Sequence, residues 1–418
     1  MVMANTVMGK QRMIKKTETD FLQILSSAIH GQKLILEETV DIEAVLQLAA
    51  RHHLLPLVCE VICECPEFIG ITRHAEYLQK SMQCVVKQIK QTHALIEVCN
   101  VLGENGIVPL ILKGLVCRRL YGALGEYRFS GDEDILIAPD DYQLVARILH
   151  QLGYHCEKGA LTYKQVCSMQ AVAFVGPDLR LEVHICPFGQ RNAGMEQMNG
   201  YFGSDVFARC IRFEEQGKWL YTLNCTDQFL FLVFHAWKHF RTAGFGVRQM
   251  LDILLFQQRY ENVINWEYVR RSVEDVKIER FWADLIVIGN RYLGFSLSSF
   301  YEEVCPDELL QDLLYCGIFG KGDATMDAAS KMAGAALTGR EDISIIRKWL
   351  KAMFPNKKYF TDHQIELEEK PWLIVRMWCY RWWKFIKRNA QHGIGMTINA
   401  LKRTKKRLRL IKNYDSNN

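Results

Sequence analysis

The sequence has no apolar run long enough to cross a bilayer. Its uninterrupted apolar stretches, such as residues 54–58 and 285–288, fall far short of the ~20 residues that a spanning helix needs. The N-terminal stretch MVMANTVMGKQRMIKKTE lacks the apolar segment of a secretory signal peptide. We therefore expect a chain without a membrane span that stays in the cytoplasm.

Paired cysteines are also missing. The 14 cysteines include no CxxC motif, and several, such as Cys117 and Cys186, lie inside apolar patterns, which is typical of reduced core thiols. Cys59, Cys63 and Cys65 form the closest group. Structural zinc normally takes four ligands and no second pair lies nearby, so we do not favour a zinc site here.

Acidic residues are absent from residues 376–412, which contain 12 Lys or Arg. The chain up to residue 375 has 40 basic and 46 acidic residues, so the net charge of +5 arises in the C-terminal segment. This segment also carries aromatic residues, which suits a nucleic-acid or anionic-membrane surface. A helix that docks on an acidic body has the same composition, and we favour docking within the chain or on a partner.

The 418 residues are 49% apolar and 24% charged. This length and composition indicate two or three packed units. Apolar residues recur at helical spacing from residue 17 to about 105 and again after Asp227. A Gly/Ala-rich stretch at 317–339 predicts a loop around one weak helix. We divide the chain into a helical N-terminal region (1–105), a core (106–190), a helical domain closing a cleft (191–340) and a basic, aromatic-rich helical segment (341–418).

Short apolar runs in the core predict four strands, IVPLILK (107–113), DILIA (134–138), VCSMQAVAFV (166–175) and LRLEVHI (179–185). The last two flank the turn Gly176-Pro177-Asp178 and predict a hairpin. A short helix is predicted at 115–122, and Asp140 or Asp141 is expected to cap the helix that ends at Gly153.

Three consecutive acids, Asp132, Glu133 and Asp134, come directly before an apolar strand. Because residues two apart in a strand share a face, Asp132 and Asp134 project together and Glu133 points the other way. Two such carboxylates can flank Mg²⁺ ions, which prefer oxygen ligands and the phosphates of a nucleotide. Acids at a surface strand end are the alternative interpretation.

Glu182 is the candidate for a third acid, which a two-metal site takes from a neighbouring element. It lies among apolar residues, on the face that also carries Arg180 and His184, in the strand we expect beside Asp132 and Asp134. A buried carboxylate there needs a cation or a partner. A salt bridge with Arg180 across a sheet edge is the alternative.

Lys113 and Gly114 follow the first strand and precede a predicted helix. Glycine lets the backbone approach an anion closely, and a helix N-terminus offers free N–H groups. Lys113 can supply a positive charge to a triphosphate. This turn therefore predicts a phosphate-binding end for the site.

The order of these motifs resembles the nucleotidyltransferase superfamily of DNA polymerase β type. More narrowly, the segments ILKGLVCRRLY, RFSGDEDILI, LRLEVHI and HAWKH…VRQMLDILL are similar to a bacterial family of largely uncharacterised nucleotidyltransferases, over about residues 20–260. The resemblance implies an α/β (α+β) fold: a polymerase β-like nucleotidyltransferase core with a small mixed sheet, flanked by helical N- and C-terminal regions.

The resemblance also implies roles for individual residues. Asp132, Asp134 and Glu182 would be the catalytic metal ligands for two Mg²⁺ ions, with Mn²⁺ as an alternative. The residues implied to contact the nucleotide are Lys113, Gly114, Arg128, Ser130, Gly131, His235 and His239. Helix packing is the favoured alternative for the two histidines, and a structural pair with Arg248 is the alternative for Asp252, which matches a polar position of the family.

Two positions depart from the superfamily pattern. Leu115 stands where a serine usually follows the glycine, so no hydroxyl is offered to phosphate. Glu133 stands at a commonly apolar position, and its side chain must reach solvent or a cation such as Arg118 or Arg119.

The predicted function is metal-dependent transfer of a nucleoside monophosphate, AMP from ATP in the simplest case, with release of pyrophosphate. The acceptor is an unidentified small molecule, peptide or protein. Nucleotide addition to RNA ends, which would use the basic tail, is a less favoured alternative. A nucleotide-binding regulatory or interaction module without turnover is another, and Leu115 and Glu133 are the reasons for considering it.

Overall fold

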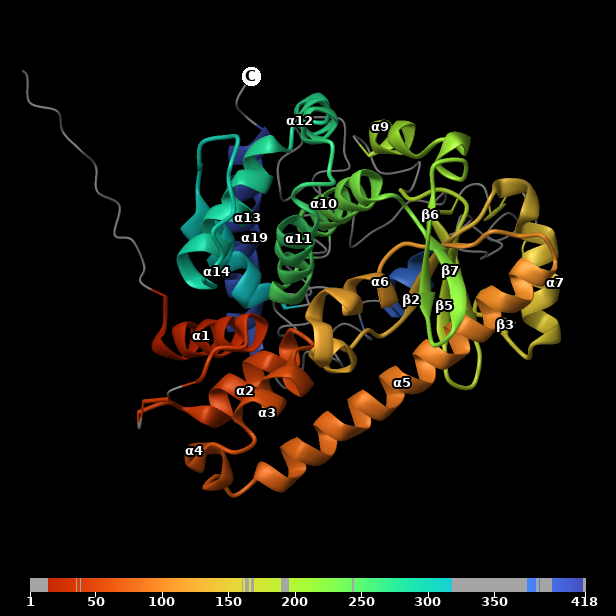
Figure 1. Cartoon of the computed structure of the whole chain (residues 1–418). Coiled ribbons are helices and arrows are strands. Elements are labelled where there is room, and N and C mark those ends of the chain that lie inside the picture. The colour runs from red at the N-terminus through yellow and green to blue at the C-terminus, as the bar shows by residue number, and fades with distance from the viewer. Residues whose placement is uncertain are drawn as a thin grey trace, which may run out of the picture.

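The computed structural model describes residues 14–317, apart from 35, 38, 160, 162–164, 167–168, 189–194 and 243, together with 374–380, 383 and 393–415. Side chains are described for these residues except 196 and 393–403. Apart from Gly317, the loop predicted at 317–339 lies outside the described residues. The described elements form a mixed sheet surrounded by helices (Figure 1).

The N-terminal region is helical, as predicted. Its helices are α1 (Lys16–His30), α2 (Ile42–Arg51), α3 (Leu55–Ile62), α4 (Pro66–Ile69) and α5 (His74–Glu104). Asp41 caps α2 by accepting a hydrogen bond from the Ala44 N–H, and prolines occupy the first turns of α3 and α4. The 31-residue α5 runs from the small helices to the far side of the sheet (Figure 1).

The sheet has seven strands in the order β3-β4-β5-β2-β1-β7-β6. Their bounds are β1 Leu110–Ile111, β2 Glu133–Leu136, β3 His155–Cys156, β4 Ala171–Val175, β5 Arg180–His184, β6 Ile211–Glu215 and β7 Lys218–Thr222. β2 pairs antiparallel with β1 and parallel with β5, and β1 pairs parallel with β7. The prediction of a small mixed sheet is confirmed.

All four predicted strand regions contribute to this sheet, and β4 and β5 form the predicted hairpin. β3 and the β6–β7 hairpin were not predicted, and the sheet therefore extends beyond residues 106–190. The helix after Gly114 is shorter than predicted: α6 (Leu115–Arg118) continues as a 3₁₀ segment, η1 (Arg119–Tyr127). Asp141 occupies the predicted N-cap position of α7 (Tyr142–Gln151), but a 3₁₀ turn, η2 (Pro139–Asp141), precedes the helix and the Asp141 side chain makes no capping hydrogen bond.

The helices after β7 pack on each other, and Gln228 in the first of them contacts Thr222 of β7. They are α10 (Cys225–Arg241), α11 (Val247–Tyr260), α12 (Trp266–Asp275), α13 (Glu279–Tyr292), α14 (Pro306–Cys316) and α19 (Gly393–Asp415). Phe229, Phe234, Phe240, Phe281 and Trp282 are among the largest fully buried side chains, so these helices share one aromatic core. None of the described helices combines the length and hydrophobicity of a membrane span.

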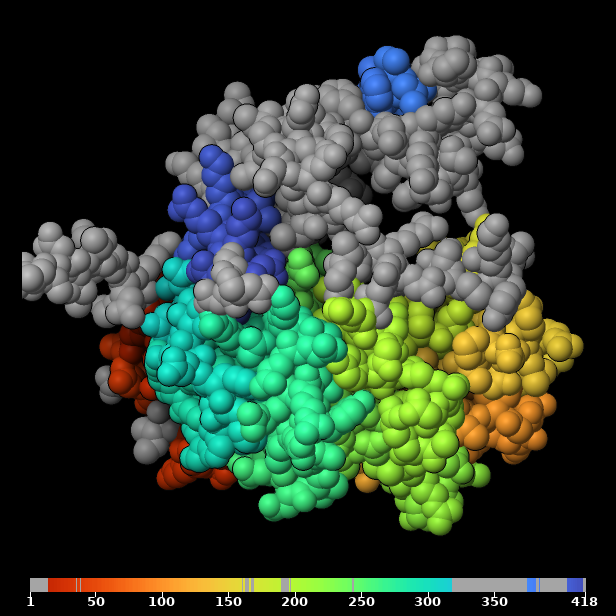
Figure 2. Space-filling view, turned by 90° about the horizontal axis from the view of Figure 1, so that it is seen from above, coloured from red at the N-terminus to blue at the C-terminus, as the bar shows by residue number. Residues whose placement is uncertain are grey.

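The basic helix α19 lies against α13 and α14 (Figures 1 and 2). Arg407 is buried and forms an ion pair with Asp312, and the Tyr414 hydroxyl donates to Asp284 at 2.5 Å. Docking within the chain or on a partner was the favoured interpretation of the C-terminal segment, and residues 404–415 dock within the chain.

Candidate nucleotide and metal site

The acids of the site come together because β2 and β5 are neighbours. Asp134 lies opposite Glu182 in the parallel register, and Leu136 lies opposite His184. Asp134, Glu182 and His184 therefore share one face of the sheet, and one ligand atom from each lies within 4.8 Å of the others. Asp132 lies just before β2, close enough to be linked to Glu182 through one arginine.

Two cations balance these carboxylates. The Lys113 Nζ lies 2.9 Å from one oxygen of Asp134. Arg180 donates to Asp132 at 3.1 Å and to Glu182 at 2.7 Å, and its other nitrogens contact Glu157. The Arg180–Glu182 salt bridge considered from the sequence is present, but the same guanidinium also binds Asp132. Both cations are groups that can attract phosphate.

The surroundings of Asp132 and Asp134 shift the pKa values of the two carboxyl groups in opposite directions. Burial, together with the charge of Asp134, raises the pKa of Asp132 to about 6. Burial also opposes the charge of Asp134, but Lys113 and His184 outweigh it and lower the pKa of that carboxyl. For Lys113, burial is outweighed by Asp134, Asp132 and Glu182, which raise its pKa. The Lys113–Asp134 pair is therefore charged at neutral pH.

α10 faces the acids from across the cleft. The Nε2 of His235 lies 3.3 Å from the Lys113 Nζ and 3.1 Å from the Nε2 of His239. Burial lowers the pKa of both imidazoles well below its usual value, so both are neutral near pH 7. The histidines thus lie beside Lys113, the lysine predicted to bind phosphate, and are not part of the group of side chains that could hold a metal ion.

The loop before Asp132 is held by two helices. Arg128 and the Tyr121 hydroxyl both bind Asp252 of α11. The Ser130 N–H donates to the side chain of Gln88 at 2.7 Å. The partner of Asp252 is therefore Arg128, while Arg248 donates to the Phe129 carbonyl oxygen. Gly131 follows this loop, and its carbonyl accepts a hydrogen bond from Gln91.

Glu133 points away from the site, and its predicted cation is Arg118, at 2.6 Å. Its carboxylate also accepts the Leu115 N–H at 3.0 Å. The N–H that the sequence suggested for phosphate at the start of α6 is therefore occupied, which corrects this part of the prediction. The predicted role of Lys113 is unchanged, because it depends on the lysine side chain and not on this N–H.

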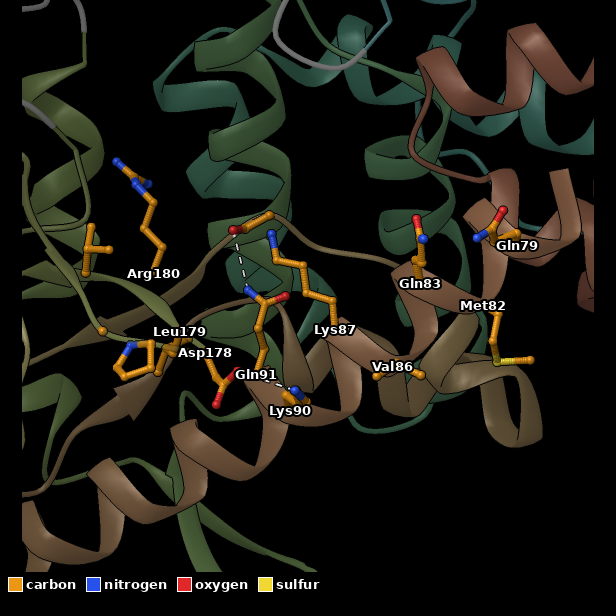
Figure 3. A pocket seen from close by; sticks show the side chains of 14 residues that line it. Gln79, Met82, Gln83, Val86, Lys87, Lys90, Gln91, Asp178, Leu179 and Arg180 are labelled. Atoms are coloured by element: carbon orange, nitrogen blue, oxygen red, sulfur yellow. Dashed lines mark hydrogen bonds and ion pairs between the residues drawn. The ribbon is translucent and has the colours of Figure 1, made fainter. Parts of the chain in front are cut away.

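Two hollows lie near the acids. A narrow pocket of about 30 Å³ lies between the sheet and α10–α11, and Lys113, Gly114, Asp132 and Asp134 line it. A groove of about 790 Å³ lies between α5 and the β4–β5 turn, and Gly131 and Arg180 are among its lining residues (Figure 3). Gly131 precedes Asp132 in the chain and Arg180 binds Asp132, so the groove lies beside the acids.

Sequence reasoning left three groups of this site without a role. His184 was noted only as sharing a face with Glu182, and Arg180 only as sharing that face and as a salt-bridge partner of Glu182. Lys238 of α10, which donates to Gln170 at 2.6 Å, was not noted at all. Burial lowers the pKa of Lys238 to about 8. The groove was also missed, because it forms between α5 and the β4–β5 turn, which are far apart in the sequence.

A lysine–glycine turn after β1, two aspartates at the start of β2 and a third acid on β5 define the core of a nucleotidyltransferase. The chain belongs to a family described as uncharacterised nucleotidyltransferase, whose model matches residues 38–294, more than half of the chain. No curated protein and no solved structure matches it significantly. The predicted membership of a nucleotidyltransferase family is thus confirmed.

Proposed function

We propose that this protein is a metal-dependent nucleotidyltransferase that transfers a nucleoside monophosphate to an acceptor and releases pyrophosphate. ATP is the expected donor. The observation that carries the proposal is the proximity of Asp132, Asp134 and Glu182 on neighbouring parts of one sheet, with Lys113 2.9 Å from Asp134. The family match supports nucleotidyl transfer in general.

The donor set suits divalent cations, because three carboxylates face only Lys113 and Arg180, and Arg180 is also shared with Glu157. Asp132, Asp134 and Glu182 would hold the ions, with Mg²⁺ expected and Mn²⁺ as the alternative. When bound, such ions lower the charge of the triphosphate and polarise the attacking oxygen.

The chain's own residues would bind and orient the substrates. Lys113 and Arg180 now neutralise carboxylates, and both are free to turn to phosphate once those carboxylates have another counter-charge. The acceptor oxygen, nitrogen or phosphate forms a bond to the α-phosphorus while the bond to pyrophosphate breaks. The proton of a protonated acceptor goes to a carboxylate of the cluster, Glu182 in our assignment.

The groove beside α5 is the proposed path of the acceptor (Figure 3). In-line displacement places the acceptor on the side of the α-phosphorus opposite to the leaving pyrophosphate. Gly131, next to Asp132 in the chain, and Arg180, which binds Asp132, both line the groove, so an acceptor lying in it would reach the acids from this side. Lys90 pairs with Asp178 and Arg180 pairs with three carboxylates, so the charges along the groove do not select the class of acceptor.

Pyrophosphate release from each of the four NTPs, with Mg²⁺ or Mn²⁺, tests the proposal. Asp134→Asn should lower the rate about 10²–10³-fold, because it removes a charge that would hold the cations against the phosphates. Asp140→Asn, at an exposed acid beyond β2, is the matched control and should leave the rate unchanged.

Unchanged turnover in Asp134→Asn would rule out the proposed chemistry. Nucleotide binding without pyrophosphate release from any NTP would instead favour the regulatory alternative. The observation behind that alternative is that Glu133 occupies the Leu115 N–H.

A further inference from the structure

His184 lies on the metal side of the sheet rather than in the core behind it. Its side chain is 3% exposed, and its Nε2 lies 2.9 Å from the Oδ1 of Asp134 and 4.0 Å from the Oε2 of Glu182. The other ring nitrogen, Nδ1, is buried and makes no hydrogen bond within the described part of the chain. When Nε2 binds a metal, Nδ1 carries the ring proton, so the observations that point to a ligand are the two carboxylate oxygens near Nε2.

The atoms that face His184 are the ones the salt bridges leave free. Lys113 binds Oδ2 of Asp134, so Oδ1 turns to the imidazole. Arg180 binds Oε1 of Glu182, so Oε2 is the oxygen nearer to His184. One cation could therefore join Oδ1, Oε2 and Nε2 while both salt bridges stay in place.

The spacing of these atoms fits a common ion. Ligand atoms about 2.1 Å from an octahedral ion lie about 3.0 Å apart when adjacent and about 4.2 Å apart when opposite. The separations from Nε2, 2.9 Å to Asp134 and 4.0 Å to Glu182, lie close to these two values. The two separations from Nε2 thus suit a common ion, and the three ligand atoms all lie within 4.8 Å of one another.

We propose that His184 is a metal ligand, and that Asp134, Glu182 and His184 form a mixed nitrogen–oxygen site for a divalent transition-metal ion such as Mn²⁺. This inference rests on the proposed function for the presence of a metal, and it concerns which metal is held. Imidazole binds first-row transition ions better than it binds Mg²⁺, which strongly prefers oxygen. The site should therefore hold Mn²⁺ more tightly than Mg²⁺.

Pulsed electron paramagnetic resonance of the full-length protein with one equivalent of Mn²⁺ tests the inference directly. A ligating imidazole gives ¹⁴N coupling to the manganese, and labelling the wild-type protein with ¹⁵N-histidine should convert that signal to the ¹⁵N pattern. This experiment changes no side chain, so it does not depend on whether a variant folds.

Variants then identify the histidine. His184→Asn should abolish the nitrogen coupling and weaken Mn²⁺ binding about tenfold or more, while changing Mg²⁺ binding much less. His93→Asn, at an exposed histidine of α5, is the matched control, and His235→Asn tests the imidazole beside Lys113. Both should retain the coupling.

The outcomes separate this inference from the proposed function. Bound Mn²⁺ without nitrogen coupling, or coupling that survives His184→Asn, would overturn the assignment of His184 while leaving nucleotidyl transfer intact. Nitrogen coupling in a protein that releases no pyrophosphate would support the metal site and count against the transfer reaction.

Discussion

At the scale of single residues, Glu133, Gly114 and Leu115 form one structural unit. The Glu133 carboxylate accepts the Leu115 N–H and an Arg118 nitrogen, and it packs directly against Gly114. A buried carboxylate here takes over the role of a helix cap. The two departures from the superfamily pattern are therefore neighbours in space, because the Glu133 carboxylate binds the backbone N–H of Leu115.

Gly114→Ala should destabilise the protein by several kcal/mol. Gly114 has a φ of 54°, and a Cβ would overlap the Glu133 carboxylate, which cannot move without leaving Arg118 buried and unpaired. Urea unfolding measures the effect. Gly131→Ala, where a Cβ meets nothing within 4 Å, is the control and should cost far less. Equal losses in the two variants would contradict this account.

Lys238→Met should stabilise the protein at pH 7, by about 1–2 kcal/mol. Burial lowers the Lys238 pKa from 10.5 to about 8, so below pH 8 the folded state carries the full cost of the partly buried charge. Removing the charge also removes the hydrogen bond to Gln170, which reduces the gain.

The lowered pKa of Lys238 also predicts how the free energy of unfolding changes with pH. Between pH 8 and 10.5 the unfolded chain binds the Lys238 proton more strongly than the folded protein, so the wild-type free energy of unfolding gains a contribution that rises with pH. Lys238→Met lacks this contribution. Its advantage over the wild type, measured by urea unfolding at pH 7 and pH 9.5, should therefore shrink. An advantage that grows with pH would show that Lys238 is not the titrating group.

At the scale of elements, α5 holds the loop that carries Asp132, although the helix itself contributes none of the site's acids. Gln88, Gln91 and Thr92 are buried polar residues on this helix. Gln88 and Gln91 bind Ser130 and Gly131, and the Thr92 hydroxyl accepts from Arg118 at 3.0 Å. The loop that carries Asp132 is thereby set against α5 on one side and, through Arg128, against α11 on the other.

Gln88→Leu should lower the rate of pyrophosphate release about 10- to 100-fold. Without the amide oxygen, the Ser130 N–H loses its partner, which costs about 1–3 kcal/mol, and Asp132 two residues later is no longer held in place. Steady-state kinetics and thermal unfolding measure the two effects. Lys80→Met, on the exposed face of the same helix, should change neither by much. Full activity in Gln88→Leu would show that α5 does not position Asp132.

Some of these elements could be predicted from the sequence and others could not, and the difference has physical reasons. β2 and β5 could be predicted because each is a short apolar run that contains or follows acidic residues. Their pairing confirms the prediction that the two strands are neighbours. β1 has only two residues, and β6 shows mostly exposed side chains, so hydrophobic periodicity identifies such strands poorly. His184 was not assigned a role because its contact with Asp134 depends on register between strands 50 residues apart.

At the scale of the whole molecule, the family region 38–294 is enclosed by helices from outside it. From the N-terminal side, Ser26 and His30 of α1 bind the Leu293 carbonyl at the end of α13. From the C-terminal side, α19 covers α10 and α13. Because α10 carries His235 and Lys238 on its other side, helices beyond the family region support the wall of the site.

Tyr414→Ala should destabilise the protein by about 3–5 kcal/mol and weaken nucleotide binding. Tyr414 is 5% exposed, its ring packs edge-on against Trp237, Phe240 and Phe281, and its hydroxyl binds Asp284. Removing the ring leaves a cavity directly behind α10. Thermal unfolding and nucleotide titration measure the two losses, and Lys412→Ala, on the exposed side of α19, should cause neither.

The RNA-end alternative makes a different prediction for the same helix. A nucleic-acid arm would bind RNA with an affinity that falls steeply with salt, and Lys412→Ala would reduce that binding while Tyr414→Ala would leave the rest of the protein stable. Arg407 is unavailable to phosphate in the docked helix, because Asp312 and the Phe240 carbonyl already hold its guanidinium. We therefore expect loss of stability, rather than loss of RNA affinity, to be the main consequence of damaging α19.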